Sequence, residues 1–510
     1  MVLFAIILCI GLAYRLPKLK QRPMHTDEAV HAMKFGALLE RNEYRYDPKE
    51  YHGPTLNYLT LLPAKIASVR KITEATETTL RIVPVCAGML LILLLFFMAD
   101  GLGRRIVLWA GLFTAVSPAF VYYSRYYIQE MLLVSFTFGA IVSGYRYLKG
   151  KNILWAVCTG FFLGLMHATK ETCIIPIGAM VLSFLILRFL QSRTKQTLPP
   201  IHFRHLFIVL LTACIISASF YTSFFTNLRG IPDSILTYKT YFQKAGQNDW
   251  HIHPWFYYFK LLIGSKQSGR PLWTEAFILV LSVVGIVAII KRRQHSDADS
   301  NLLRFLALYA IIMAIVYSII PYKTPWTMLG FYHTMIIMAA AGVSRLLTIH
   351  TARWTRIIIL TIVIVGLSHL AYQSYLSNFK YEADASNPVV YAHTTKDIFT
   401  IAEKVTKISE VHPDGKNMCI QVICPGHDYW PLPWYFRSFP NVGWWSEVDS
   451  TFQPAPVVLA SPGIERDLIE KLYESQPPGE KSLYVPLFES VVELRPQVKI
   501  RGYVIILNAE

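Results

Sequence analysis

Long apolar runs, separated by short polar connections, fill the first 376 residues of the chain. Their lengths predict about eleven transmembrane helices, because a helix needs roughly twenty apolar residues to cross a bilayer. Some runs are short, so one or two of them fit tilted pairs or re-entrant segments equally well. The expected helices are Met1–Tyr14, Leu80–Ala99, Ile106–Tyr122, Met131–Tyr147, Ile153–Ala168, Thr172–Phe189, Leu206–Thr226, Leu272–Ile290, Leu303–Ile320, Thr327–Gly342 and Ile357–Tyr375.

Hydropathy falls from Ser377 onward, where short β-like runs alternate with a helical stretch. This pattern is typical of an α/β domain outside the membrane. We therefore predict two domains: a transmembrane module of residues 1–376, with a first polar loop over about residues 15–79, and a C-terminal soluble α/β domain of residues 377–510. The expected strands are Met418–Ile423, Val457–Ala460 and Tyr503–Leu507, and the expected helix is Gly463–Tyr473.

The composition supports a polytopic membrane protein. Hydrophobic residues make up 53% of the chain and charged residues 16%, and the mean hydropathy is +0.37. A soluble protein of this length needs more charge to cover its surface. The net charge of +16 does not indicate nucleic-acid binding, because Lys and Arg occur in short clusters between apolar runs, as the positive-inside rule produces.

These basic clusters also predict the orientation of the chain. The short connections on the opposite side hold only Arg125, Lys170 and Lys323. We therefore expect a cytoplasmic N-terminus and an extracytoplasmic C-terminal domain. The short loops lack eukaryotic insertions, which favours the plasma (inner) membrane of a bacterium or archaeon. The clusters are Arg104 and Arg105; Arg146, Lys149 and Lys151; Arg193, Lys195 and Arg204; Lys291, Arg292 and Arg293; and Arg345, Arg353 and Arg356.

Two adjacent carboxylates, Asp27 and Glu28, follow the first helix. Such a pair beside a membrane is costly unless a cation or a proton-transfer role compensates it. Capping is an equally good interpretation, with Thr26 or Asp27 at the start of a short amphipathic helix. Further along this loop, His52 is either a substrate contact or an ordinary polar residue beside a tight turn.

Arg125 and Glu130 lie among four tyrosines where the third helix turns into the fourth. The tyrosines are typical of an interfacial aromatic belt, whereas Arg125 opposes the positive-inside bias. The pair is either a mutual ion pair, or an anion-binding Arg beside a metal-binding or acid–base Glu. Lys170 and Lys323 bring two more cations to this face, and mixed charge of this kind suits a phosphate held together with a divalent ion.

Several function classes are excluded by the sequence. It has no P-loop, GxGxxG or HExxH motif in a credible context, which argues against a nucleotide-driven pump and a zinc protease. The predicted spans are apolar through their centres and show no two related halves, unlike those of a secondary transporter. The seven cysteines indicate neither a disulfide framework nor a zinc site.

At these motifs the membrane half resembles the GT-C superfamily of glycosyltransferases, which includes protein O-mannosyltransferases and aminoarabinose transferases. The resemblance rests on the acidic pair, on Ser124-Arg125-Tyr126 followed by Glu130, and on Thr169-Lys170. A closer similarity is to the flippase activity-associated proteins, a group named for its genomic neighbourhood. It covers the strings HTDEAVHA (25–32), YHGPTLNYL (51–59), YYSRYYIQEM (122–131), YKTPW (322–326), YAHTTKD (391–397) and WPLPWYFR (430–437).

The resemblance implies inverting transfer of a sugar from a polyprenyl-phosphate donor to a hydroxyl of a glycan, lipid or protein acceptor at the outer membrane face. It makes Asp27 the general base, with Glu28 and Glu130 assisting it or binding the metal. The same three carboxylates are the implied ligands of a divalent ion, Mg or Mn with Zn as an alternative. Glu130 stands where many relatives have Asp. The implied substrate-binding residues are Arg125, Lys170, Lys323, His52 and Tyr126.

The C-terminal region is rich in aromatic residues, over 429–437 and at Trp444 and Trp445. They form either a packed core with a docking surface, which is favoured, or an acceptor-binding surface on which sugars stack. The tryptophan pair is similar to that of oligosaccharyltransferases, but the rest of that motif is missing. The alternative function is a non-catalytic partner or transporter of lipid-linked oligosaccharides.

Overall fold

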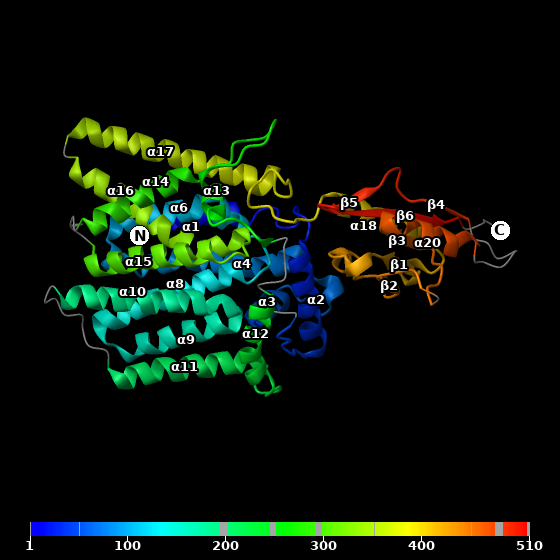
Figure 1. Ribbon diagram of the computed structural model, residues 1–510, viewed down its shortest axis with the longest axis horizontal. Coiled ribbons are helices and arrows are strands. Elements are labelled where there is room, and N and C mark those ends of the chain that lie inside the picture. The colour runs from blue at the N-terminus through cyan, green and yellow to red at the C-terminus, as the bar shows by residue number, and fades with distance from the viewer. Residues whose placement is uncertain are drawn as a thin grey trace.

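The computed structural model consists of a helical bundle with a smaller domain at one end (Figure 1). It describes residues 2–49, 52–193, 202–244, 251–291, 298–350, 352–449, 451–474 and 483–506. Four residues used in the sequence predictions, Lys195, Arg292, Arg293 and Leu507, lie outside these ranges, as do Met1 and Tyr51.

The bundle contains a helix at each predicted span. Seven of its described helices are long and apolar enough to cross a membrane, and three shorter ones, α1, α9 and α14, are also apolar. Helices α6 and α7 together occupy the remaining predicted span. The multi-pass helical architecture is therefore confirmed, while the count of eleven crossings stays a prediction. The helices are α1 (Val2–Arg15), α4 (Glu77–Phe96), α5 (Ala99–Leu102), α6 (Arg104–Val116), α7 (Pro118–Tyr123), α8 (Glu130–Gly150), α9 (Ile153–Thr169), α10 (Ile174–Ser192), α11 (Phe203–Tyr221), α14 (Ala276–Ile290), α15 (Ser300–Ile319), α16 (Leu329–Ile349) and α17 (Arg353–Tyr375).

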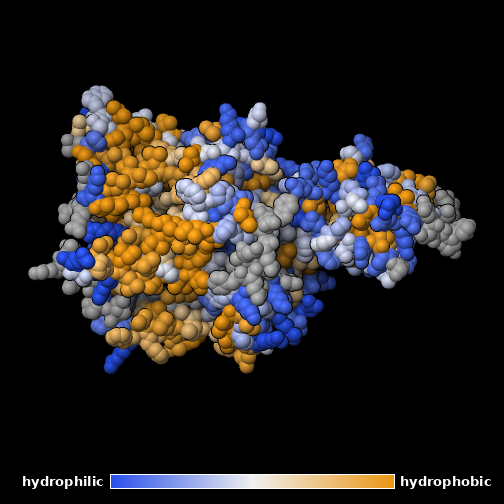
Figure 2. All heavy atoms as spheres, viewed as in Figure 1, coloured by the Kyte–Doolittle hydropathy of each residue, from blue (hydrophilic) through white to orange (hydrophobic). Residues whose placement is uncertain are grey.

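Apolar side chains cover the outside of the bundle as well as its core. Figure 2 shows a broad hydrophobic band over the bundle, with hydrophilic residues at its two ends. Glycines let some helices approach closely inside it: a Cβ on Gly285 of α14 would lie 2.0 Å from the Met338 carbonyl oxygen of α16. Close packing at small residues is typical of helices in a bilayer, where lipid already satisfies the apolar surface.

Short helices gather at the end of the bundle that faces the smaller domain (Figure 1). The first, α2, begins with a capping box in which His25 Nδ1 accepts the Asp27 N–H at 3.0 Å and Glu28 accepts the His25 N–H at 3.1 Å. The capped helix is therefore present, but His25, and not Thr26 or Asp27, is its cap. These elements are α2 (Thr26–Arg41), α3 (Thr55–Ile66), η1 (Ile72–Glu74), η2 (Glu171–Cys173), α12 (Gly230–Lys244), α13 (Tyr257–Ile263), η4 (Pro325–Met328) and η5 (Leu376–Lys380).

The C-terminal domain is a small sheet flanked by helices. Its strand order is β2-β1-β3-β6-β4, with β5 paired to β6. Strands β1, β2 and β3 are parallel, whereas β6 runs antiparallel to β3, β4 and β5. The expected strands lie at β1, β3 and β6. The elements are α18 (Asp397–Val411), η6 (Gly415–Asn417), β1 (Ile420–Ile423), η7 (Pro425–His427), α19 (Leu432–Tyr435), β2 (Val442–Trp445), β3 (Val457–Ala460), η8 (Pro462–Ile464), α20 (Glu465–Ile469), η9 (Glu470–Glu474), β4 (Tyr484–Pro486), β5 (Val492–Arg495) and β6 (Val498–Ile505).

The aromatic string over 430–437 docks this domain onto the first loop. Trp434 is fully buried, and its Nε1–H donates to Glu77 at 2.9 Å. Arg437 lies over the Trp434 ring and donates to the carbonyls of Ile72 and Ala75. These contacts favour packing and docking over sugar stacking for this string.

Candidate active site

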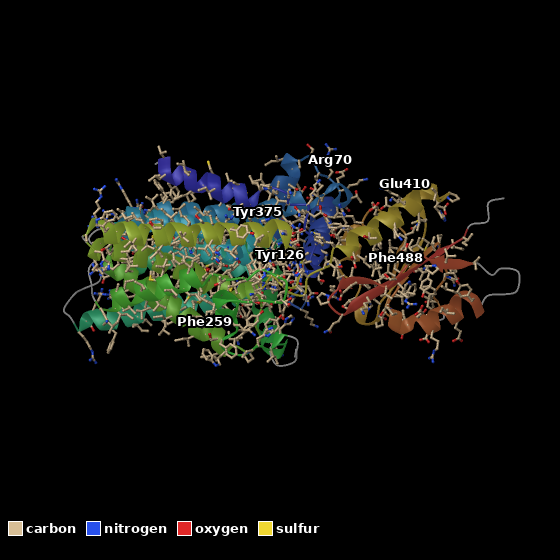
Figure 3. All side chains as sticks on the ribbon, turned by 90° about the horizontal axis from the view of Figure 1, so that it is seen from above. Arg70, Tyr126, Phe259, Tyr375, Glu410 and Phe488 are labelled. Atoms are coloured by element: carbon tan, nitrogen blue, oxygen red, sulfur yellow. The ribbon has the colours of Figure 1, made fainter. Side chains whose placement is uncertain are left out.

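The site residues predicted from the sequence lie where the bundle meets α2 and the C-terminal domain. Figure 3 labels Tyr126 at this junction. Two helices carry their charged ends here: α8 begins at Glu130, and α9 ends at Thr169, directly before Lys170. An acid at the start of a helix and a base at its end both interact favourably with the helix dipole.

Asp27 has the freest carboxylate of the predicted set. Its side chain is 46% exposed, and within the described chain only His25 Nδ1, at 3.8 Å, comes within ion-pair distance. Burial lowers the pKa of His25, so that ring is neutral near pH 7 and does not neutralise the Asp27 charge. A carboxylate with open oxygens is suited to accept a proton from a bound hydroxyl.

Glu28, by contrast, is buried and surrounded by donors. Arg81 binds both of its oxygens, at 2.8 and 2.7 Å, Arg22 lies 3.5 Å away, and the backbone N–H of Tyr127 donates at 2.8 Å. Burial alone would raise the pKa of Glu28, but the two guanidinium groups lower it to about 2. Glu28 is therefore held as the ion-pair partner of Arg81, with its lone pairs already used, and its predicted assisting or metal-binding role stays a prediction.

Arg125 is also committed to the fold. Its Nη1 donates to the carbonyls of Tyr14, Arg15 and Pro17, and its Nη2 to that of Lys18. These carbonyls lie at and beyond the C-terminus of α1, where they have no hydrogen-bond donor within the helix, and a cation is a suitable partner for them. Arg125 forms no ion pair with Glu130; it holds the end of α1 in place, and its anion-binding role stays a prediction.

Glu130 pairs with Lys170 instead. The Nζ of Lys170 donates to Glu130 Oε1, and both residues are buried, at 5% and 4% exposure. A buried pair keeps both charges in place with little freedom to move. The structure therefore brings together Glu130, a predicted catalytic carboxylate, and Lys170, a predicted phosphate-binding cation.

The loop that contains His52 packs onto the end of α9. His52 Nδ1 donates to Glu171 at 2.7 Å, and Thr55 and Thr169 are hydrogen-bonded at 2.8 Å. Gly53 permits this contact, because a Cβ there would lie 2.2 Å from the Ala168 carbonyl oxygen. His52 is thus tied to the residue after Lys170.

His31 connects Asp27 with these pairs. It lies one helical turn after Asp27 on α2, its ring is 6.3 Å from that of His52, and its Nδ1 is 3.5 Å from Gln129 Nε2. Burial, together with His52, lowers the pKa of His31 to about 3, while Asp27 acts in the opposite direction. His31 therefore lies between Asp27, on its own helix, and His52, which binds the residue after Lys170.

Tyr126 and Lys323 complete the predicted set. The Tyr126 ring packs 5.4 Å from His25 and 6.1 Å from Trp326, with the Arg22 guanidinium over its face. Lys323 is buried at 1% exposure, and its Nζ donates to the Ile320 carbonyl. Trp326, three residues after Lys323, lies 6.2 Å from the His25 ring, which places this turn beside the cluster.

The proposed metal ligands do not come together as a set. No group of three His, Cys, Asp or Glu side chains suited to hold a metal ion occurs in the parts of the chain described. Glu28 is held by Arg81 and Glu130 by Lys170, which leaves Asp27 alone of the three predicted ligands. The three carboxylates therefore form no ready-made ligand set among the described residues, and the divalent ion stays a prediction.

Sequence reasoning missed the residues that support the site. Arg81 and Arg22 hold Glu28, and Gln129 and Glu171 contact the histidines. Arg81 carried a detectable signal, since an arginine at the start of an apolar span is expensive and usually has a dedicated partner. His25 and His31 are part of the string HTDEAVHA, but their spacing gave no reason to expect a role different from that of ordinary loop residues.

Comparison with known proteins gives the fold a name. The family model for dolichyl-phosphate-mannose-protein mannosyltransferases matches residues 52–219. The structure of ArnT from Cupriavidus metallidurans bound to undecaprenyl phosphate superposes with a TM-score of 0.66 and 14% identity, over 98% of this chain and 97% of that one. The chain has the GT-C fold. The GT-C fold that its motifs indicated is thereby confirmed.

A second GT-C neighbour comes from an archaeon. The oligosaccharyltransferase AglB of Archaeoglobus fulgidus, in complex with an inhibitory peptide and a dolichol-phosphate, has a TM-score of 0.56 at 13% identity, over 91% of this chain and 69% of that one. The same enzyme in complex with Zn and sulfate has a TM-score of 0.53, at 13% identity and over 90% of this chain and 68% of that one. No curated protein matches the chain by sequence.

Proposed function

We propose that this chain transfers a sugar from a polyprenyl-phosphate donor to an acceptor hydroxyl on the extracytoplasmic face of the plasma membrane, with inversion at the anomeric carbon. The observation that carries the proposal is the open carboxylate of Asp27 on the helix that also carries His31, whose ring lies 6.3 Å from that of His52, the hydrogen-bond partner of the residue after Lys170. A base and a cation at one site suit a hydroxyl nucleophile and an anionic leaving group.

The reaction divides into one bond formed and one broken. The acceptor hydroxyl gives its proton to Asp27, and its oxygen bonds to the anomeric carbon. The bond from that carbon to the phosphate oxygen breaks, and its electron pair stays on the phosphate. Lys170 and Lys323 stabilise the negative charge that develops there. ArnT bound to undecaprenyl phosphate and AglB with a dolichol-phosphate support a lipid-phosphate donor in this fold.

The divalent ion stays a prediction outside this scheme. A relative of the same fold has been seen with Zn and sulfate, but the chemistry above uses only Asp27 and the two lysines. Glu130 acts as the partner that keeps Lys170 oriented until the donor phosphate arrives. The donor sugar and the acceptor, whether glycan, lipid or protein, are left to an assay with a panel of donors.

The deciding experiment is Asp27→Asn in the full-length protein. General-base catalysis contributes roughly 10²–10⁴-fold, so we expect the release of polyprenyl phosphate from the donor to fall by about that factor while the melting temperature stays unchanged. Glu43→Gln is the control, because Glu43 is an exposed carboxylate in the same loop. Full activity of Asp27→Asn, or no turnover across the panel by the unaltered protein, would favour the non-catalytic partner in transport of lipid-linked oligosaccharides.

A further inference from the structure

The C-terminal domain reaches the residues that lie just before Asp27. The hydroxyl of Thr394 donates to the Met24 carbonyl at 2.7 Å, and the Met24 N–H donates to the Tyr435 hydroxyl at 2.9 Å. Both bonds join the domain to the residue preceding His25, the cap of α2. The domain is therefore built into the site and is not a separate appendage.

Two histidines stack at this contact. The rings of His25 and His393 are 5.5 Å apart and within 13° of parallel, and the two residues are 5% and 3% exposed. The Nε2 atoms of both rings are buried and have no hydrogen-bond partner among the described residues. Because His25 Nδ1 accepts the Asp27 N–H, the neutral ring carries its proton on Nε2, which makes that atom an unused donor.

Arg495, at the end of β5, supplies a second unused donor. The N–H of Thr395, two residues after His393, donates to the Leu494 carbonyl at 3.0 Å, which holds the end of β5 beside this contact. Arg495 pairs with Asp428 through Nη2, while its Nε is buried and without a partner in the described chain. Through the bond from Thr395 to Leu494 and the stacking of His393 on His25, Arg495 lies on the same side of the domain as the cap of α2.

We propose that Arg495 and His25 bind an oxyanion of the acceptor, a phosphate or a carboxylate close to the hydroxyl that Asp27 deprotonates. This inference rests on the proposed function and names the acceptor class. Buried N–H donors without acceptors are costly, and a guanidinium beside a neutral N–H is best matched by an anion. The carboxylates of Asp27 and Asp428 oppose that anion, so binding depends on the nitrogen donors.

The test is direct binding by the full-length protein in detergent. Undecaprenyl phosphate is added to saturation, so that the donor-phosphate site at Lys170 is filled, and inorganic phosphate or glucuronate is then titrated by calorimetry with glucose as the neutral control. We expect the anions to bind and glucose not to. Arg495→Gln should weaken anion binding about tenfold or more, the usual effect of losing a charge-assisted hydrogen bond. Phosphate and glucuronate as separate arms distinguish the two anions.

Three further variants make the result decisive. Asp428→Asn removes an opposing charge from a half-exposed position and should tighten anion binding, while Arg495→Lys should retain part of it. Arg501→Gln is the matched control, because Arg501 lies in the same domain and pairs with Glu465; its affinity should equal that of the unaltered protein. Equal affinities of Arg495→Gln and the unaltered protein, or looser binding by Asp428→Asn, overturn the inference.

Failure of this inference is separable from failure of the proposed function. Anion binding that survives Arg495→Gln, together with loss of transfer in Asp27→Asn, overturns the anion site and leaves the glycosyltransferase in place. Anion binding that depends on Arg495 in a protein with no transfer activity supports the site and removes the enzymatic assignment.

Discussion

Asp27 and Glu28 are neighbours with the same charge, yet their surroundings give them opposite roles. Glu28 completes the capping box of α2 and receives two buried guanidinium groups, while Asp27 keeps open oxygens at 46% exposure. The sequence indicated the pair but could not separate its members, because the deciding partner, Arg81, is 53 residues away. The same limit applies to Arg125, whose partners are carbonyls of residues 14–18.

Removal of the Glu28 charge should destabilise the protein without a specific effect on chemistry. Glu28→Gln leaves Arg81 and Arg22 buried without a counter-charge, and breaking a buried pair in this way costs about 3 kcal/mol or more. We expect a clearly lower thermal midpoint in detergent, with any remaining folded protein still active. Glu43→Gln, at an exposed position, should shift stability by less than about 0.5 kcal/mol. A Glu28→Gln protein that is stable but inactive would return Glu28 to the catalytic machinery.

The pKa of Glu28 also predicts an acid-sensitive fold. This pKa is about 2 in the folded protein against 4.5 for the unperturbed group, so the folded state favours the charged form. The resulting stability is fully present above about pH 4.5 and is lost as the pH falls toward 2. Thermal midpoints measured over this range should decline in the unaltered protein and decline less in Glu28→Gln; parallel slopes would contradict this role.

At the scale of elements, hydropathy predicts most of the bundle because each apolar run became a helix, most of them close to their expected bounds. The largest difference is α16, which continues to Ile349, seven residues past the expected Gly342. Another difference is the predicted span Ile106–Tyr122, which is divided into α6 and α7. Pro118 has no N–H for a continuous helix, and Ser117 caps the second piece. Short amphipathic elements such as α2 and α3 were harder to foresee, since their packing against the bundle decides them more than their own pattern does.

The contact between the His52 loop and the end of α9 gives a prediction at this scale. Gly53→Ala would bring a Cβ to 2.2 Å from a backbone carbonyl of α9, and a backbone atom cannot rotate away. We expect the loop to separate from Thr169 and Lys170, with a lower thermal midpoint and a raised KM for the lipid-phosphate donor. Gly178→Ala on α10 is the control, because a Cβ there meets nothing within 4 Å. Equal behaviour of the two variants would show that the contact does not position Lys170.

At the scale of the whole molecule, the site is made of segments that the sequence keeps far apart. The bond from Thr394 to Met24 spans 370 residues, and that from Trp434 to Glu77 spans 357. The resemblance to a family covers both the first loop and the C-terminal strings. Hydrophobic periodicity and residue propensity, however, do not encode a contact between residues so far apart in the sequence. What the sequence did predict is the end of the bundle at which the segments meet, because the short connections at that end contain few basic residues.

Charge asymmetry thus predicts how the molecule sits in its membrane. Helices α6 and α7 run from Arg104 to Tyr123, beside the site, so Arg104 marks the opposite end of the bundle from Glu410 on α18 of the C-terminal domain (Figures 1 and 3). Both residues are exposed. In cells with an intact plasma membrane, a cysteine at 410 should react with a membrane-impermeant maleimide, whereas a cysteine at 104 should react only after permeabilisation. The unsubstituted chain measures the background from its native thiols. Labelling of position 104 in intact cells would show the opposite orientation, with the Asp27 site on the cytoplasmic face. The basic clusters would then lie outside the cell, against the positive-inside rule.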